Sequence, residues 1–522
     1  MKAIFKPLGL AAAVAAVTAG YTGVAGAQTA PSVASNSLGD LAIVPYYTTA
    51  IGFVTGVHII NTSGQTQVVK LRLRRGTDSM DALDFNLILS PFDEWTGWLD
   101  DDEDVSVGPL ASDTSTISFK TTDNSCTVPA FIGQQGFIDM PVTYRPGAGT
   151  GYIEVLGMGS APVSSPIGVA SKHINGVPVD CDLAADNFFQ NNSIPGFGGV
   201  ANPALIGVLS STQTNQRFGA GSVATTTYGP TGNVLKVSYF VRDAASGIEF
   251  GNDAVHIADF GASPSMTNQE FGLFSGDLQG FDFPDLNGAA PANGGLRGLY
   301  DGLRTALGGS SVINDWSANA ANNVGTDWVI TVPGQYTMMN LYKYLFTQIP
   351  EDHPLHDPLF TCTALNDCDH RDIPLRAGFI AWDREERGIA DIPGELVPSP
   401  SIPGQIPTTV LEYEVNVVEW GVEPVLRADN PVTIGVPDGA VYGWAELLVS
   451  PFGNRTQAVC EFVADPNNPT LVDITNPVDC NNPVTTKAPL VGFVAWQRSF
   501  ADNPSRNYGR AVEHSYGSVP SN

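Results

Sequence analysis

The densest group of potential metal ligands lies in two neighbouring segments, residues 351–357 and 367–372. They read Glu-Asp-His-Pro-Leu-His-Asp and Asp-Cys-Asp-His-Arg-Asp. Imidazole and carboxylate groups are ligands for zinc and similar ions. Pro354 prevents a regular helix through the first segment, so its histidines cannot share a helix face. The candidate metal ligands are His353, His356 and His370. The alternative, which we favour, is a surface loop with incidental histidines.

A second candidate site is a run of five consecutive acids. These are Asp100, Asp101, Asp102, Glu103 and Asp104. Calcium binds several carboxylate oxygens at once, so calcium is the one cofactor that the sequence suggests. Adjacent residues of an extended chain point in opposite directions, however, and five in a row rarely converge on one ion. We therefore predict a solvated acidic loop, with calcium binding as the alternative.

Motifs of common enzymes are absent from the sequence. There is no Gly-x-Ser-x-Gly elbow, no His-Glu-x-x-His zinc motif and no phosphate-binding loop. Glycoside hydrolysis needs two carboxylates about 5–9 Å apart in a cleft, and no such pair is identifiable from sequence. We therefore predict no catalytic residue, and a function without catalysis is favoured over an enzymatic one.

The chain is strongly acidic. It has 53 Asp and Glu against 25 Lys and Arg, which gives a formal charge of −28. A field of this sign repels nucleic acid and anionic lipid headgroups, so neither is an expected partner.

The N-terminus and the cysteines indicate export. Residues 1–27 have a basic start, a short apolar run and a small-residue cleavage site, as in a secretory signal peptide. No later apolar run is long enough for a transmembrane helix. An even number of cysteines in an exported chain indicates disulfides. Pairing nearest neighbours joins Cys126 with Cys181, Cys362 with Cys368 and Cys460 with Cys480, although six cysteines allow 15 connectivities.

Short strands separated by turns dominate the predicted secondary structure. The clearest is 68–75, in which Val69, Leu71 and Leu73 alternate with charged residues, so we predict one buried and one wet face. The fold class predicted is mainly β: two immunoglobulin-like β-sandwich domains with one short helical insertion. The expected divisions are 28–200 and 201–522, with the helix near 295–307.

Six motifs resemble those of large exported proteins of Gram-negative bacteria, a family described as cell-surface or hypothetical proteins. The motifs are residues 45–47, 61–62, 83–91, 326–331, 383–386 and 413–416. The resemblance implies a cell-surface, extracellular or periplasmic location and no established activity. We expect a structural or adhesive surface protein that self-assembles or binds cell-surface or matrix components. The alternatives are a cation-binding surface module and a secreted polysaccharide hydrolase.

Overall fold

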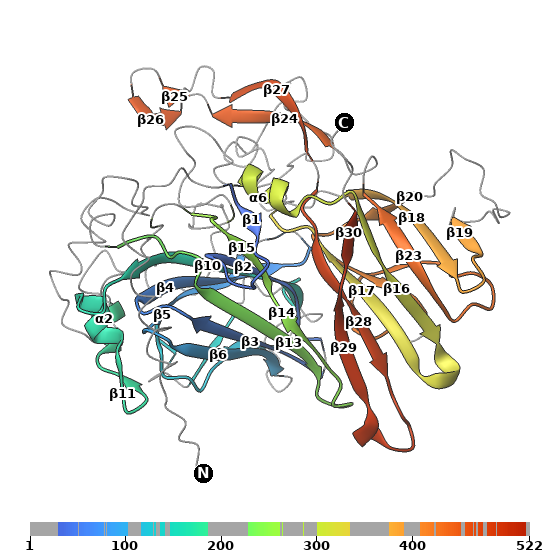
Figure 1. Ribbon diagram of the computed structural model, residues 1–522, viewed down its shortest axis with the longest axis horizontal. Coiled ribbons are helices and arrows are strands. Elements are labelled where there is room, and N and C mark those ends of the chain that lie inside the picture. The colour runs from blue at the N-terminus through green and yellow to red at the C-terminus, as the bar shows by residue number, and fades with distance from the viewer. Residues whose placement is uncertain are drawn as a thin grey trace, which may run out of the picture. The chain divides into compact units, whose positions relative to one another are not determined.

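The computed structural model describes most of the chain after residue 29 (Figure 1). The described residues are 30–50, 52–77, 79, 81–102, 116–128, 130–131, 136–140, 147–185, 228–261, 264, 286, 300–334, 375–390, 408–421, 424–449, 455–462, 464–465, 468–472, 478–486 and 488–517. The predicted signal peptide lies outside them.

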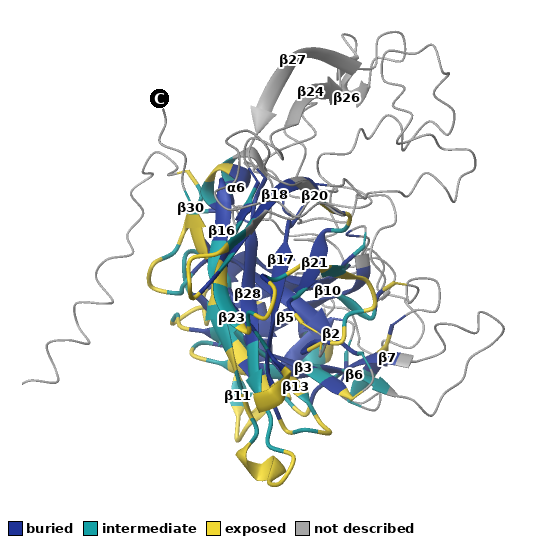
Figure 2. Ribbon diagram, turned by 90° about the vertical axis from the view of Figure 1, so that its right-hand side faces the viewer, coloured by how far each residue is buried: buried dark blue, intermediate teal, exposed yellow. Residues whose placement is uncertain are grey.

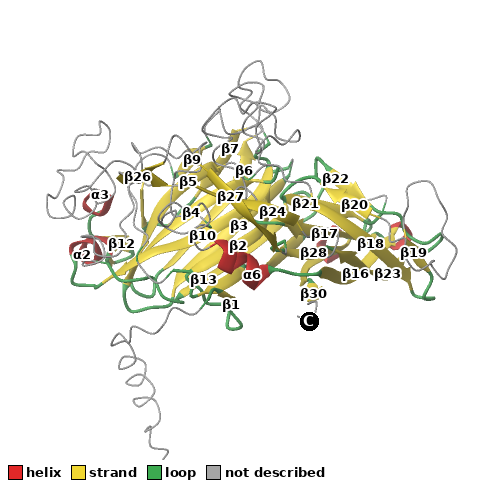
Figure 3. Cartoon of the chain, turned by 90° about the horizontal axis from the view of Figure 1, so that it is seen from above, coloured by secondary structure: helices red, strands yellow, loops and turns green. Residues whose placement is uncertain are grey.

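Strands dominate the described residues, which confirms the predicted mainly-β class (Figure 3). The strand pairs are antiparallel except for one parallel pair, β21 with β22. The described α-helices are short: α2 (Pro166–Ser171), α3 (Cys181–Ala185) and α6 (Tyr300–Leu307). The last ends where the helix near 295–307 was predicted to end. The immunoglobulin-like detail stays a prediction.

Two sheets enclose the first part of the core. The seven-stranded sheet has the order β1 (Ser32–Val33), β15 (Val255–Ala258), β2 (Leu41–Thr48), β10 (Thr150–Ala161), β4 (Thr66–Arg75), β5 (Asp81–Leu89), β8 (Cys126–Val128). The six-stranded sheet has the order β14 (Glu249–Asp253), β13 (Leu235–Asp243), β3 (Phe53–Asn61), β6 (Glu94–Asp102), β7 (Thr116–Lys120), β9 (Phe137–Asp139). Alternate apolar residues of both sheets, such as Leu71, Val57 and Val237, form one buried cluster.

A third sheet has eleven strands. Its main path is β19 (Gly388–Ala390), β18 (Leu375–Asp383), β23 (Tyr442–Leu448), β16 (Ser311–Asn319), β17 (Val324–Thr331), β21 (Val415–Glu419), β22 (Pro431–Thr433). Three more strands pair with this path, namely β20 (Thr408–Leu411), β28 (Val491–Arg498) and β30 (Ser515–Gly517), and β29 (Tyr508–Glu513) pairs with β28. The core of this sheet includes three buried indoles, Trp316, Trp328 and Trp420, and the first and last stack at 5.5 Å.

Three further pairs of short strands are described. They are β11 (His173–Ile174) with β12 (Val177–Pro178), β24 (Arg455–Phe462) with β27 (Val478–Thr486), and β25 (Ala464–Asp465) with β26 (Asn468–Val472). Two 3₁₀ turns, η4 (Ala320–Asn322) and η8 (Pro504–Arg506), lie next to strands of the large sheet.

The sheets extend across the predicted boundary at residue 200. Strand β13 pairs with β3, and β15 pairs with β2, so residues after 201 complete the first two sheets. The first core also includes Val329 and Phe493 of the large sheet, and Thr331 Oγ1 donates to Pro45 O at 2.6 Å. Strands β2, β10, β17 and β28 are accordingly buried along most of their length (Figure 2).

The predicted wet face of β4 is wrong. Lys70, Arg72 and Arg74 are 0%, 1% and 1% exposed. Their partners are buried carboxylates on the neighbouring strands: Arg74 pairs with Glu154 at 3.0 Å and Lys70 with Asp84 at 3.5 Å. The same side of the sheet carries a second apolar cluster that includes residues of α2 and α3, so both faces are covered.

One predicted disulfide is present. Cys126 of β8 is bonded to Cys181 of α3, which attaches that helix to the sheet. Cys362 and Cys368 lie outside the described residues. Cys460 and Cys480 lie on the paired strands β24 and β27, beside the irregularity between Val459 and Glu461. Their pairing therefore stays a prediction. Within the described part of the chain, none of the helices has the length and apolar character needed to cross a membrane.

Candidate functional site

The predicted metal ligands do not form a site in the described part of the chain. His353, His356, His370, Glu103 and Asp104 lie outside the described residues. Asp100, Asp101 and Asp102 are strand residues of β6, so the prediction of a loop is wrong for them. No group of three metal-ligating side chains is found among the residues that are described.

The acidic run continues a strand because β7 lies beside it. Asp100, Asp101 and Asp102 face Ser118, Ile117 and Thr116 in the antiparallel register. Asp100 also pairs with Lys120 at 3.0 Å. Backbone pairing and a cross-strand cation thus offset the repulsion between neighbouring carboxylates.

The larger of two described cavities has a volume of about 450 Å³. It lies between β13–β15, the end of α6 and strands β28–β30. Its volume falls within the range of small-molecule sites. The polar side chains on its wall include Tyr239, His256, Glu513, His514 and Tyr516.

The two histidines of this cavity are held by backbone groups. His256 Nε2 accepts from the Val237 N–H at 2.8 Å, and His514 Nε2 donates to Val329 O at 2.9 Å. Desolvation lowers the pKa of each imidazole to about 4. A general base works best with a pKa near the operating pH, so neither ring is suited to that role near neutrality.

Two carboxylates, those of Asp253 and Glu513, line the same cavity. Asp253 forms an ion pair with Lys236. Burial raises the pKa of Asp327 to about 7, but this residue does not line the cavity. Its Oδ2 instead accepts from the backbone N–H groups of Val425 and Leu426, at 2.8 and 2.7 Å. The raised pKa therefore belongs to a buried turn contact.

We expect replacement of His514 by glutamine to flatten the acid dependence of stability. The folded-state pKa of about 4 lies below the ordinary histidine pKa of 6.5. The unfolded chain therefore takes up the proton first, and stability present above pH 6.5 is lost as the pH falls toward 4. The loss from this residue is about 3 kcal/mol. Urea unfolding of both proteins across this pH range measures it, and parallel pH profiles would contradict the assignment.

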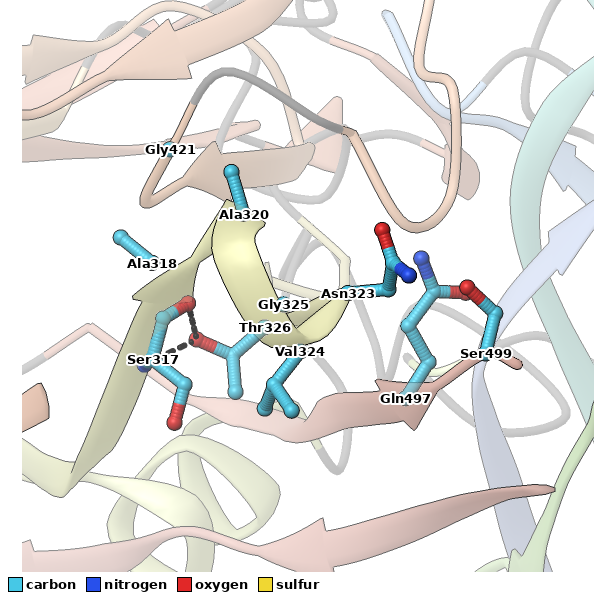
Figure 4. Close-up of a pocket in the computed structure, with 10 residues that line it drawn as sticks. All are labelled: Ser317, Ala318, Ala320, Asn323, Val324, Gly325, Thr326, Gly421, Gln497 and Ser499. Carbon is cyan, nitrogen blue, oxygen red and sulfur yellow. Dashed lines mark hydrogen bonds between the residues drawn. The ribbon is translucent and has the colours of Figure 1, made fainter. Parts of the chain in front are cut away.

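The smaller cavity, of about 170 Å³, lies beside the β16–β17 turn (Figure 4). Figure 4 shows the side chains of Asn323, Gln497 and Ser499 grouped at one side of it. Thr326 Oγ1 accepts from the Ser317 N–H at 2.9 Å, so that hydroxyl is held by the fold. No acid, base or thiol lines this cavity, and it is smaller than ordinary ligand sites.

The outer face of the large sheet carries exposed aromatic residues. Trp382 of β18 and Trp444 of β23 face each other in the register, and their rings stack at 4.0 Å and 14°. Trp444 is 43% exposed. Arg384 lies 4.4 Å over the ring of Tyr442 on the same strand pair. We call these four residues the tryptophan face.

Buried groups hold the tryptophan face from below. Trp316 Nε1 donates to the carbonyl oxygens of Trp382 and Trp444, each at 3.2 Å. Gly443 leaves room for this ring, because a Cβ there would lie 2.7 Å from Trp316 and 1.8 Å from Trp382 O. The backbone that carries Trp382 and Trp444 is thus fixed by hydrogen bonds from a buried side chain. An exposed aromatic group of this kind is typical of interaction surfaces.

Comparison with protein-family models, curated proteins and solved structures finds no match for this chain.

Sequence reasoning missed the tryptophan face, although a signal for it was present. Residues 378–384 and 492–498 share a Gly-Phe-x-Ala-Trp-x-Arg pattern, and 443–446 reads Gly-Trp-Ala-Glu. Side chains of a strand point to opposite faces in turn, so each tryptophan points outward and the small residue before it points inward. The contact itself depends on pairing β18 with β23, which lie far apart in the chain.

Proposed function

We propose that this chain is an exported, non-enzymatic adhesive protein of the cell surface, and that the tryptophan face is a contact surface. Export rests on the signal-like residues 1–27 and on the cysteine pattern. The observation that carries the adhesive role is the stacked Trp382–Trp444 pair, in which Trp382 is half-buried and Trp444 exposed, on a sheet whose core contains buried tryptophans.

The chemistry of the tryptophan face favours binding without catalysis. Aromatic rings supply large, rigid contact area at little cost in conformational entropy. Arg384 adds hydrogen-bond donors at the edge of the same face. The larger cavity, by contrast, holds two histidines with a pKa of about 4, and no acid or base lines the smaller one.

Alanine replacement of both indoles tests this proposal. We expect the Trp382→Ala, Trp444→Ala double variant to lose at least about tenfold in affinity for whole Gram-negative cells or for an insoluble neutral polysaccharide that retains the wild-type protein. Sedimentation with these ligands measures the bound fraction.

The matched control for this experiment is Phe92→Ala. Phe92 is 74% exposed and lies on the turn between β5 and β6. This variant loses an exposed aromatic ring of another sheet and should keep wild-type binding. Equal losses in both variants, or wild-type protein that binds neither cells nor any polysaccharide, would refute the proposed contact surface. Thermal unfolding confirms that each variant is folded.

A further inference from the structure

One hairpin of this acidic protein gathers arginines and aromatic rings. Strands β28 and β29 pair antiparallel and are joined by residues 499–507. The group consists of Trp496, Arg498, Phe500, Arg506, Tyr508 and Arg510, which we call the arginine hairpin. The hairpin also carries Asp502 and Glu513, so its three arginines leave a small local excess of positive charge in a chain of 25 basic residues and 53 acids.

Each guanidinium of the arginine hairpin lies over a ring. Arg510 is 5.0 Å from the centroid of Trp496, and Arg498 and Arg506 are 4.8 and 4.4 Å from that of Phe500. In the register Trp496 faces Arg510, and Arg498 faces Tyr508, so these four side chains share one face of the hairpin. Stacking restricts the guanidinium planes before any ligand arrives.

None of these three guanidiniums has a hydrogen bond or ion pair with the part of the chain that is described. Other arginines behave differently, since Arg387 pairs with Asp383, and Arg427 pairs with Asp243 at 3.2 Å. Arg498 Nε is buried without a hydrogen-bond acceptor in the described residues.

We propose that the arginine hairpin is a binding site for an acidic polysaccharide, recognised through its uronate carboxylates. A guanidinium presents planar N–H edges that match a carboxylate with two parallel hydrogen bonds. The ring of Tyr508 is 44% exposed beside these edges and offers an apolar surface to a sugar ring. Double-stranded DNA is a poorer match, because its bases are stacked inside the duplex and offer no ring face to the exposed Tyr508.

This site is separate from the tryptophan face, so the two proposals can fail independently. The probe is polygalacturonate, and its fully methyl-esterified form is the neutral control. With the full chain, we expect binding to the acid form only, weakening as salt rises from about 50 to 200 mM. Isothermal titration calorimetry measures both ligands.

Variants assign this binding to the arginines. Arg498→Gln, Arg510→Gln should reduce affinity for polygalacturonate at least about tenfold. Arg498→Lys, Arg510→Lys keeps the charge and loses the planar edge, so its affinity should lie between the two. Arg384→Gln is the matched control, since Arg384 also lies over a ring but belongs to the tryptophan face. It should bind polygalacturonate like the wild type.

Four outcomes would overturn the proposal. These are no binding of polygalacturonate, equal binding of the methyl ester, a loss in Arg384→Gln as large as in the hairpin variants, and duplex DNA binding as tight as that of polygalacturonate. Loss of neutral-polysaccharide or cell binding in the tryptophan variants, with polygalacturonate binding intact, would leave the arginine hairpin supported.

Discussion

Glu154→Ala is expected to lower the free energy of unfolding by about 3–5 kcal/mol. Glu154 Oε1 accepts from Arg74 Nε at 3.0 Å, and these side chains are 0% and 1% exposed. Removing the carboxylate leaves a guanidinium in a desolvated position, where burial is costly without a counter-charge. Urea unfolding at neutral pH measures the change.

A surface ion pair provides the matched control. Lys120 and Asp100 also pair at 3.0 Å across strands, but their side chains are 20% and 27% exposed. Lys120→Ala should therefore lower stability by no more than about 1 kcal/mol. Replacing the buried pair together, as in Arg74→Met, Glu154→Leu, should restore much of the loss, because the Arg74 charge is removed together with the Glu154 charge. A small effect of Glu154→Ala would show that this face of β4 is hydrated.

Asp327→Asn is expected to stabilise the protein in alkaline solution by about 2 kcal/mol or more. Burial is the main cause of the raised pKa of about 7, and the negative charge of Glu419 adds to it. The folded protein holds this proton between pH 3.8, the ordinary pKa of an aspartic acid, and about pH 7, where the unfolded chain has lost it. Stability from this residue is thus present at low pH and lost as the pH rises through about 7.

The neighbouring carboxylate gives a second check on Asp327. Glu419 faces Asp327 across the β17–β21 pair, so Glu419→Gln removes a repulsive charge. The fall in stability should then end at a lower pH than in the wild type and should be smaller. Denaturant unfolding from pH about 4 to about 9 measures both variants. A wild-type profile that coincides with that of Asp327→Asn would contradict the assignment.

The sequence was sufficient to predict the strands, but it did not reveal which of their faces are buried. The alternation in 68–75 predicted β4, because side chains of a strand point to opposite faces in turn. The same alternation suggested water beside Lys70, Arg72 and Arg74. Glu154, which pairs with Arg74, is 80 residues away in the chain, and a local pattern does not contain such a partner.

Local hydrogen bonds also altered a predicted element. Leu411, Tyr413, Val415 and Val417 alternate with polar residues, a pattern that predicts one strand over 409–420, yet the chain forms β20 and β21 with a turn between them. Asn416 makes this turn: its Nδ2 donates to Tyr413 O at 2.6 Å, and its Oδ1 accepts from the Tyr413 N–H at 3.2 Å. Asparagine side chains compete in this way with strand pairing, so the break has a residue-level cause.

The tryptophan face and the arginine hairpin both depend on the register of strand pairing, which a single sequence does not reveal. Trp382 and Trp444 come together only when β18 pairs with β23, and Arg510 meets Trp496 only in the β28–β29 register. A shift of one residue would turn each ring to the other face of its sheet. The composition predicted an acidic exterior, but it could not show where arginines collect.

The central claim is that the stacked pair of Trp382 and Trp444 contacts a surface ligand. Oxidative footprinting of Trp444 tests this claim most directly. Trp444 is 43% exposed, whereas Trp95, Trp316, Trp328 and Trp420 are buried and serve as internal references. The proposal predicts that Trp444 is oxidised in the free protein and protected when the protein is bound to cells or to the retained polysaccharide. Equal oxidation of Trp444 in the free and bound protein would contradict it.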